Sequence, residues 1–170
     1  MKQILFGLLL LLAVVVSMLV YVRISASKTA LPQLFHEEVA EDETGELHVT
    51  FLDIGQGDAT FIQFPDGQQM LVDCAIDSRV LEALGRVMPF YDRSIDYLMI
   101  THPDKDHFGG CEDVLERFDV ANIIYTGVEK KGNKSWQSYL SAQQSEGATY
   151  HQIEQEDTWA IASTTLHFLY

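Results

Sequence analysis

The stretch from Thr101 to Gly110, which reads Thr-His-Pro-Asp-Lys-Asp-His-Phe-Gly-Gly, constrains the fold of this chain more than any other. It follows an apolar run, Ile95–Ile100, that is typical of a buried strand, and it precedes a helical pattern over Cys111–Phe118. A loop between a strand and a helix lies at the carboxyl end of the strand, where open α/β sheets bind ligands. We therefore expect an α/β fold whose chemistry is carried by this loop.

Four side chains of the loop are of metal-ligand type, namely His102, Asp104, Asp106 and His107. Imidazole and carboxylate are the donors that hold Zn²⁺ or Mn²⁺ in hydrolytic sites. We expect the first two on one side of the loop and the last two on the other, so that the loop serves two ions with help from other segments. The pair Gly109–Gly110 would let the backbone pack closely behind, since it has no Cβ. The alternative is a loop whose acids cap the next helix while its histidines are solvated.

A second segment, Leu47–Phe61, reads as a strand, a glycine-rich turn containing Asp58, and another strand. The sequence Pro65–Gly67 then predicts a hairpin turn, and a third strand ends at Asp73. This order places two further aspartates at turns and strand ends, where they are available to the same site.

These pieces together resemble the metallo-β-lactamase superfamily, and within it the extracytoplasmic hydrolase domain of ComEC-type DNA-uptake proteins and its stand-alone membrane-anchored relatives. The likeness rests on Leu52–Asp58, on Val72–Asp73 and on Thr101–Gly110, which occur in the family's order. It runs from about Leu47 to about Leu115. The resemblance implies a partial αββα sandwich, of which this chain covers the amino-terminal half.

The resemblance also implies roles for the loop residues. His102 and Asp104 would ligate a first divalent ion, with aspartate standing where most superfamily members have a second histidine. Asp106 and His107 would ligate a second ion, and Asp106 would orient the attacking water. Zn²⁺ and Mn²⁺ both suit this donor set.

Asp58 and Asp73 are similar to family residues that orient the metal ligands without binding the metal themselves. The alternative is local, because glycine-rich turns favour aspartate and an aspartate at a strand end often caps the next element. The dipeptide Cys74–Ala75 departs from the family, which usually has a small hydroxyl residue and glycine there. This departure bears on the shape of the loop beside the metals.

The superfamily normally draws further ligands from its second half. After His107 the chain offers only His151 and His167, and we assign neither to the site. His167 lies in an alternating, strand-like stretch, where a solvated histidine is the expected outcome. The chain is then either a fragment of a longer protein or a truncated relative whose site needs a partner chain or a carboxyl-terminal extension.

The amino terminus has a different character, since Ile4–Val22 carries no charged residue. About 20 apolar residues span a bilayer as a helix. We expect a signal anchor over residues 1–24, with cleavage as the alternative, an acidic linker over 25–46 and the domain over 47–170. The resemblance implies a single-pass protein of the bacterial cytoplasmic membrane with its domain outside, an orientation that the flanking charges leave open.

Two cysteines, Cys74 and Cys111, are expected near the carboxyl ends of neighbouring strands. Two buried thiols are the favoured interpretation. A disulfide bridge and a cysteine in the metal shell are the alternatives.

The chain has 25 acidic against 11 basic residues and a net charge of −14, with no Lys or Arg from Thr29 to Ser78. This balance argues against a simple electrostatic nucleic-acid binder, because phosphate contacts need basic side chains. Bound divalent ions would add positive charge at the site. The one basic cluster, Lys130, Lys131 and Lys134, is interpreted as a loop face.

Further helices are predicted over Ser78–Met88 and Asn133–Ser145, the latter with Trp136 and Tyr139 facing inward. Strands are predicted over Val120–Tyr125 and Thr158–Ala162.

Three functions are compatible with these patterns. The favoured one is a membrane-anchored two-metal hydrolase in which a metal-bound hydroxide attacks a phosphodiester, DNA included. The second is a hydrolase of the same fold acting on a thioester, lactam or lactone. The third is a non-catalytic, truncated or partner-requiring half-domain.

Overall fold

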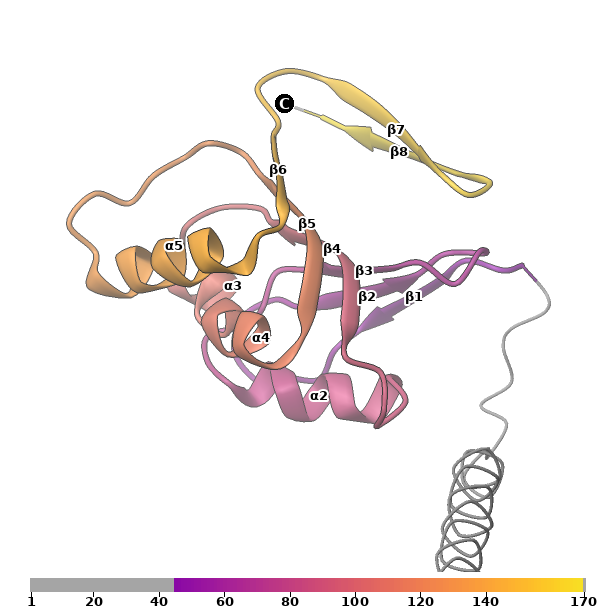
Figure 1. Cartoon of the computed structure of the whole chain (residues 1–170), viewed down its shortest axis with the longest axis horizontal. Helices are drawn as coiled ribbons and strands as arrows, with labels where there is room; N and C mark the ends of the chain where they lie inside the picture. Colours follow the sequence, from indigo (N-terminus) through magenta and orange to yellow (C-terminus); the bar gives the residue numbers. More distant parts are fainter. Residues whose placement is uncertain (1–44, 170) are drawn as a thin grey trace, which may run out of the picture. The chain divides into compact units, whose positions relative to one another are not determined.

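The structure is a computed structural model that describes residues 45–169. Its centre is a six-stranded sheet in which the strands follow the chain order (Figure 1). The strands are β1 (His48–Phe51), β2 (Thr60–Gln63), β3 (Gln69–Val72), β4 (Ser94–Ile100), β5 (Asp119–Tyr125) and β6 (Thr149–Gln152). The pairs β1–β2 and β2–β3 are antiparallel, whereas β3–β4, β4–β5 and β5–β6 are parallel. The parallel half therefore presents several carboxyl ends at one edge of the sheet.

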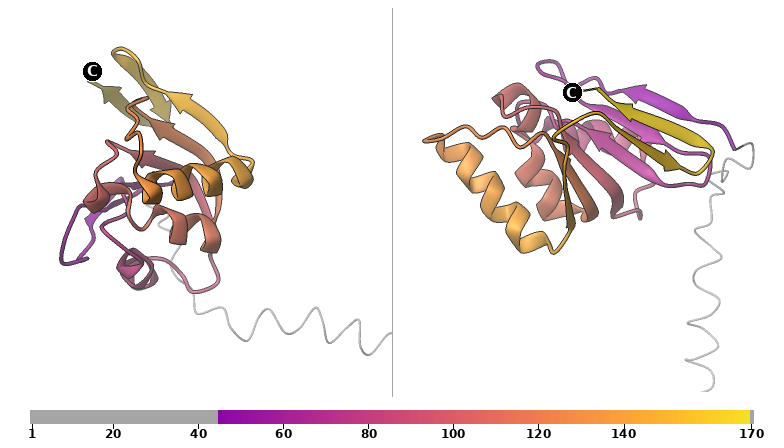
Figure 2. Two further views of the ribbon diagram at one scale, coloured as in Figure 1. Left: turned by 90° about the vertical axis from the view of Figure 1, so that its left-hand side faces the viewer. Right: turned by 90° about the horizontal axis from the view of Figure 1, so that it is seen from above.

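Helices connect the parallel strands and cover one face of the sheet (Figures 1 and 2). They are α2 (Arg79–Val87), α3 (Lys105–Phe108), α4 (Cys111–Arg117) and α5 (Lys134–Glu146). The predictions of helices over 78–88, 111–118 and 133–145 are confirmed. In α5 the side chain of Asn133 accepts a hydrogen bond from the backbone N–H of Trp136 and so caps the helix. Trp136 and Tyr139 are buried, as predicted.

A two-stranded hairpin, β7 (Asp157–Ile161) and β8 (Thr164–Phe168), packs on the opposite face of the sheet (Figure 2). Sheet side chains alternate between the two faces, as the twofold period of a strand requires. Leu71 and Leu98 belong to the cluster beneath the helices, whereas Met70 and Ile124 pack with hairpin residues such as Phe168. The result is a mixed α/β arrangement with helices on one side of the sheet and a second small sheet on the other, consistent with part of an αββα sandwich.

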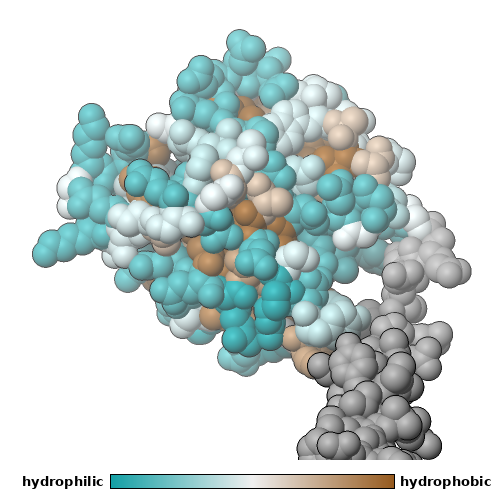
Figure 3. Space-filling view, viewed as in Figure 1, coloured by the Kyte–Doolittle hydropathy of each residue, from teal (hydrophilic) through white to brown (hydrophobic). Residues whose placement is uncertain are grey.

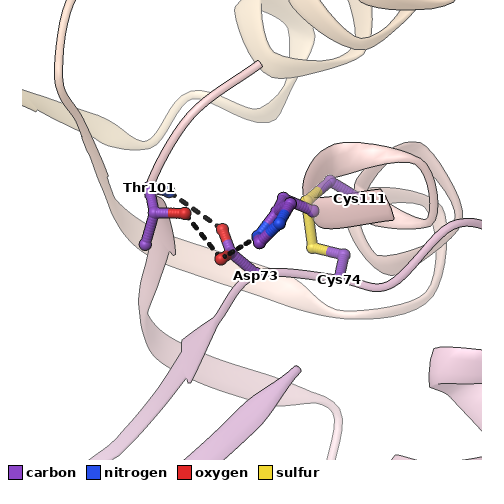
Figure 4. The surroundings of a disulfide bond; sticks show 5 residues. Asp73, Cys74, Thr101 and Cys111 are labelled. Carbon is purple, nitrogen blue, oxygen red and sulfur yellow. Dashed lines mark hydrogen bonds and ion pairs between the residues drawn. A yellow bond between two sulfur atoms is a disulfide. The ribbon is translucent and has the colours of Figure 1, made fainter. Parts of the chain in front are cut away.

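Two local expectations differ from the structure. Residues Lys105–Phe108 form the short helix α3, so Asp106 and His107 lie on a helical turn and not on an open loop. The favoured interpretation of two buried thiols was wrong, because Cys74 and Cys111 form a disulfide with a Cα–Cα distance of 5.1 Å (Figure 4). Cys74 lies just after the carboxyl end of β3, and Cys111 begins α4. The short helix α3, which precedes α4, brings the two cysteines together.

The signal anchor expected over residues 1–24, and most of the linker expected over 25–46, lie outside the described residues. Within residues 45–169, no helix combines the length and apolar character that crossing a membrane requires. In the view of Figure 3 the surface of this part is mostly hydrophilic with separate apolar patches.

Candidate metal centre

The candidate side chains gather at the carboxyl edge of β3 and β4. Asp73 directly follows β3, and His102 lies just beyond β4. Because the two strands are parallel and adjacent, their carboxyl ends emerge side by side. The turn before β2 contributes Asp58, whose backbone N–H donates to the carbonyl oxygen of Asp106 at 3.0 Å. Residues distant in the sequence are thereby brought to one place.

Asp73 is the buried anchor of this group, with only 3% of its surface exposed. Its carboxylate accepts hydrogen bonds from the backbone N–H of Thr101 at 2.9 Å and from the Thr101 hydroxyl at 2.6 Å (Figure 4). It also lies 2.8 Å from Nδ1 of His107. A carboxylate only accepts, so the Nδ1 atom of His107 carries the proton and its Nε2 atom is left to face the site.

Burial and the surrounding carboxylates act in opposite directions on the pKa of the His107 imidazole. Burial by itself lowers the pKa of His107. The hydrogen bond to Asp73 and the negative charges of the nearby aspartates outweigh burial, and the pKa lies above its usual value. On the other side of the ring, Nε2 of His107 lies 3.6 Å from Oδ2 of Asp58. Asp58 thus faces the ring nitrogen that is free to bind a metal.

His102 lies against His107, with 3.8 Å between the two ring centroids. Its Nδ1 atom lies 3.0 Å from the Thr101 hydroxyl oxygen. Since that hydroxyl gives its proton to Asp73, it accepts from Nδ1–H of His102 and leaves Nε2 of this ring available as well. The expectation that the two histidines lie on opposite sides of the loop was wrong, because the α3 turn folds His107 back onto the strand ends.

Asp104 and Asp106 occupy the outer part of the group. Oδ2 of Asp104 lies 3.5 Å from Nε2 of His102, while its Oδ1 atom accepts a hydrogen bond from Lys130 at 2.6 Å. The hydrogen bond and charge of Lys130 hold the pKa of the Asp104 carboxyl below its usual value. Asp106 is half-buried on α3, and its charge is one of those that raise the pKa of His107.

Glycines allow the segments to approach this closely. A Cβ on Gly57 would lie 2.1 Å from the carbonyl oxygen of Asp106, and one on Gly110 would lie 2.4 Å from that of Cys74. Gly57 also has a φ of 97°, which disfavours any residue with a Cβ. The close backbone packing predicted for Gly109–Gly110 is confirmed.

The donor types and the pair spacings fit a divalent ion. When two donor atoms bind the same ion at about 2.0–2.2 Å in a tetrahedral shell, the two atoms lie roughly 3.3–3.6 Å apart. The pairs His107–Asp58 at 3.6 Å and His102–Asp104 at 3.5 Å match that spacing. Among residues 45–169, however, no group of three or more His, Cys, Asp or Glu side chains is arranged to hold an ion. Residues 45–169 thus provide pairs of donors for a metal ion but no complete set of ligands around one.

Two contributors were not recognised in the sequence. Thr101 bridges Asp73 and His102, and its position directly after a buried strand was the available signal. Lys130 was interpreted only as part of a loop face, and nothing local indicates its contact with Asp104. The two unassigned histidines have other partners, since His151 contacts Asn122 and His167 contacts Thr158.

Comparison with known proteins gives the family. The model of the metallo-beta-lactamase superfamily matches residues 52–166, and the chain belongs to this superfamily. The chain is also similar to ComE operon protein 3 of Bacillus subtilis (strain 168), with 26% identity over 146 residues. The match covers 74% of this chain and 18% of that relative, so the chain spans less than a fifth of its length. The predicted resemblance to the superfamily and to its ComEC-type members is confirmed.

Proposed function

We propose that this protein is a membrane-anchored, metal-dependent hydrolase whose favoured substrate is a phosphodiester, DNA included. The observation that carries the proposal is the His102–His107 pair, in which each ring has its Nδ1 atom engaged and its Nε2 atom directed at a carboxylate. The superfamily is generally hydrolytic, which supports the reaction class. The similarity to ComE operon protein 3 supports the resemblance to ComEC-type DNA-uptake proteins, and the choice of DNA as a substrate rests on that resemblance.

In this proposal His102 and Asp104 hold one divalent ion, and His107 and Asp106 hold the other, with Asp58 beside Nε2 of His107 as a supporting group. Bound divalent ions would supply positive charge that activates a water for attack on phosphorus and stabilises the leaving oxygen of the phosphodiester. Asp106 orients that water.

The supporting residues of the site act on protons and orientation. Asp73 keeps the proton of His107 on Nδ1, and the Thr101 hydroxyl does the same for His102. Both rings are thereby oriented so that the unprotonated Nε2 atom can bind a metal ion through its lone pair. The proposal keeps the orienting role predicted for Asp73 and adds Thr101 to it.

The disulfide supports an extracytoplasmic location for the domain. Disulfides form and persist in oxidising compartments and are rare in a reducing cytoplasm. Cys74 and Cys111 are joined and buried, so the bridge fits a domain that folds outside the cytoplasmic membrane. Anchoring by residues 1–24 is part of the same proposal.

Two alternatives are compatible with the described residues. Hydrolysis of a thioester, lactam or lactone would use the same metal donors, because the superfamily fold defines hydrolysis in general and not one bond. A non-catalytic or partner-requiring half-domain is favoured by the lack of three convergent donors within residues 45–169. The remaining ligands would then come from a partner chain or from an extension.

The test combines metal content with a substrate panel. The full chain is expected to bind Zn²⁺ or Mn²⁺ and to hydrolyse a phosphodiester reporter in preference to a lactam or a thioester. His107→Ala is expected to lose metal and to lower the rate by more than about 100-fold, because it removes a direct ligand and not only a group that orients one. His167→Ala is the matched control, because this exposed histidine lies on β8 and contacts Thr158. Metal-free wild-type protein would favour the half-domain, and unchanged His107→Ala protein would refute the site.

A further inference from the structure

Two short segments of the candidate site are joined by three separate ties. The first segment is Asp73–Ala75 and the second is His107–Cys111. The Asp73 carboxylate bonds the His107 ring at 2.8 Å, and the N–H of Cys74 donates to the His107 carbonyl oxygen at 2.6 Å. The third tie is covalent, since Cys74 is bonded to Cys111 (Figure 4). Side chain, backbone and disulfide therefore all hold His107 to the end of β3.

The first segment has an unfavourable backbone on both sides of its cysteine. Asp73 has a φ of 59° and Ala75 a φ of 61°, so both lie in the left-handed region. Residues with a Cβ are disfavoured there, and such conformations persist only where the surroundings impose them. The segment consequently depends on its ties to keep the Asp73 carboxylate under the His107 ring.

The disulfide is well placed to impose this conformation. Both cysteines are fully buried, and Cys111 begins α4 directly after the glycine pair that follows α3. A Cβ on Gly110 would lie 2.4 Å from the carbonyl oxygen of Cys74, so the two backbones are already in contact at this point. The bridge spans a separation of 37 residues that includes α2, β4 and α3. It thus closes a covalent loop around the elements that carry His102 and His107.

We propose that the Cys74–Cys111 disulfide is a positioning element of the metal site, which keeps Asp73 and His107 in register and thereby strengthens metal binding in the oxidised protein. This inference rests on the proposed function for its metal-binding consequence. The bridge acts through Asp73 and does not contact the metal. Because the reduced chain lacks the covalent tie, the left-handed segment relaxes and His107 loses its fixed orientation.

Formation of the bridge balances as a dithiol–disulfide exchange. The Cys74 and Cys111 thiols lose two protons and two electrons and become one disulfide. A protein disulfide oxidant of the exported-protein compartment takes up both and becomes a dithiol. Assembly of the site is in this way tied to the compartment in which such an oxidant operates.

The test uses the full chain and the double variant Cys74→Ala/Cys111→Ala, both studied well below their unfolding temperatures. One readout is the Zn²⁺ affinity, measured by competition with a coloured chelator. The other is hydrogen exchange at the amide of position 74, which donates to His107. The double variant is expected to lose at least about tenfold in both affinity and protection, as for other changes that disturb the groups around a metal ligand.

Phe168→Leu is the matched control, because Phe168 packs in the hairpin-side cluster on the opposite face of the sheet. It is expected to lower the unfolding temperature while leaving the affinity and the exchange at position 74 unchanged. If the double variant fails to fold, Cys74→Ala/Cys111→Val restores side-chain volume without the bridge and takes its place.

Wild-type affinity and protection in either double variant would overturn the inference. Failure of the wild-type protein to bind Zn²⁺ would instead refute the metal-binding part of the proposed function. In that case exchange at position 74 still decides whether the bridge positions His107, so the two failures are distinguishable.

Discussion

Nδ1 of His107 lies 2.8 Å from Oδ2 of Asp73, a carboxylate that also accepts two hydrogen bonds from Thr101. This single contact selects the tautomer of His107 and directs its Nε2 atom toward Asp58. A buried carboxylate with three donors is costly to disturb, because each donor that loses its partner stays desolvated.

Asp73→Asn is expected to lower the free energy of unfolding by about 1–3 kcal/mol, since the amide removes the charge and presents a donor to groups that themselves donate. Chemical denaturation measures this loss. Glu116→Gln makes the same chemical change at an exposed position of α4 and should leave stability nearly unchanged. Equal effects of the two substitutions would contradict the anchoring role of Asp73.

Stability is expected to depend on pH through His107, whose folded-state pKa lies above the usual value of 6.5. The unfolded imidazole titrates near 6.5, so the stabilisation by protonated His107 is fully present below that pH. It is lost as the pH rises through the raised pKa of the folded state. Denaturation between pH 5.5 and 8.5, with a chelator present, should show this fall in wild type and in His167→Gln but not in His107→Gln.

In the proposed site Lys130 would compete with the metal for Asp104, because its ammonium group already donates a hydrogen bond to one oxygen of that carboxylate. Lys130→Met is expected to raise the affinity for Mn²⁺ about two- to fivefold, the range that corresponds to an exposed ion pair. Stability should change little, since 42% of the Lys130 side chain and 57% of the Asp104 side chain are exposed to solvent. Titration calorimetry measures the affinity, and Lys131→Met is the control. An affinity that falls in Lys130→Met would show that Lys130 assists binding.

Gly110→Ala is expected to lower the free energy of unfolding by about 1–3 kcal/mol, as is typical of overpacking. The added Cβ would lie 2.4 Å from the carbonyl oxygens of Cys74 and Asp77, and backbone cannot move aside easily. Gly85→Ala is the matched control in α2, where a Cβ meets nothing within 4 Å. It should stabilise the protein by about 0.5–1 kcal/mol. Thermal unfolding tests this prediction. The unfolding temperature should fall in Gly110→Ala and rise in Gly85→Ala.

Local patterns were sufficient for most of the fold. The helices over Arg79–Val87 and Cys111–Arg117 and the strand over Asp119–Tyr125 were all predictable, because the period of the apolar residues reports the element directly. The superfamily was also predictable, since its motifs are contiguous runs of residues that a linear reading preserves. The short helix α3 was missed because it consists of only Lys105–Phe108, which is too brief for any period to appear.

The sequence by itself determined which metal-ligand side chains are present, that they follow the carboxyl ends of strands, and to which superfamily the chain belongs. Only the tertiary structure decided the pairings: His107 with Asp73 and Asp58, Asp104 with Lys130, and Cys74 with Cys111. Each of these pairings joins different segments of the chain. The partners lie 26 positions apart for Asp104 and Lys130, 34 for Asp73 and His107, and 37 for the two cysteines. Their contacts depend on sheet register and on the α3 turn, which are global properties of the packed chain, whereas element type depends on the period of neighbouring residues.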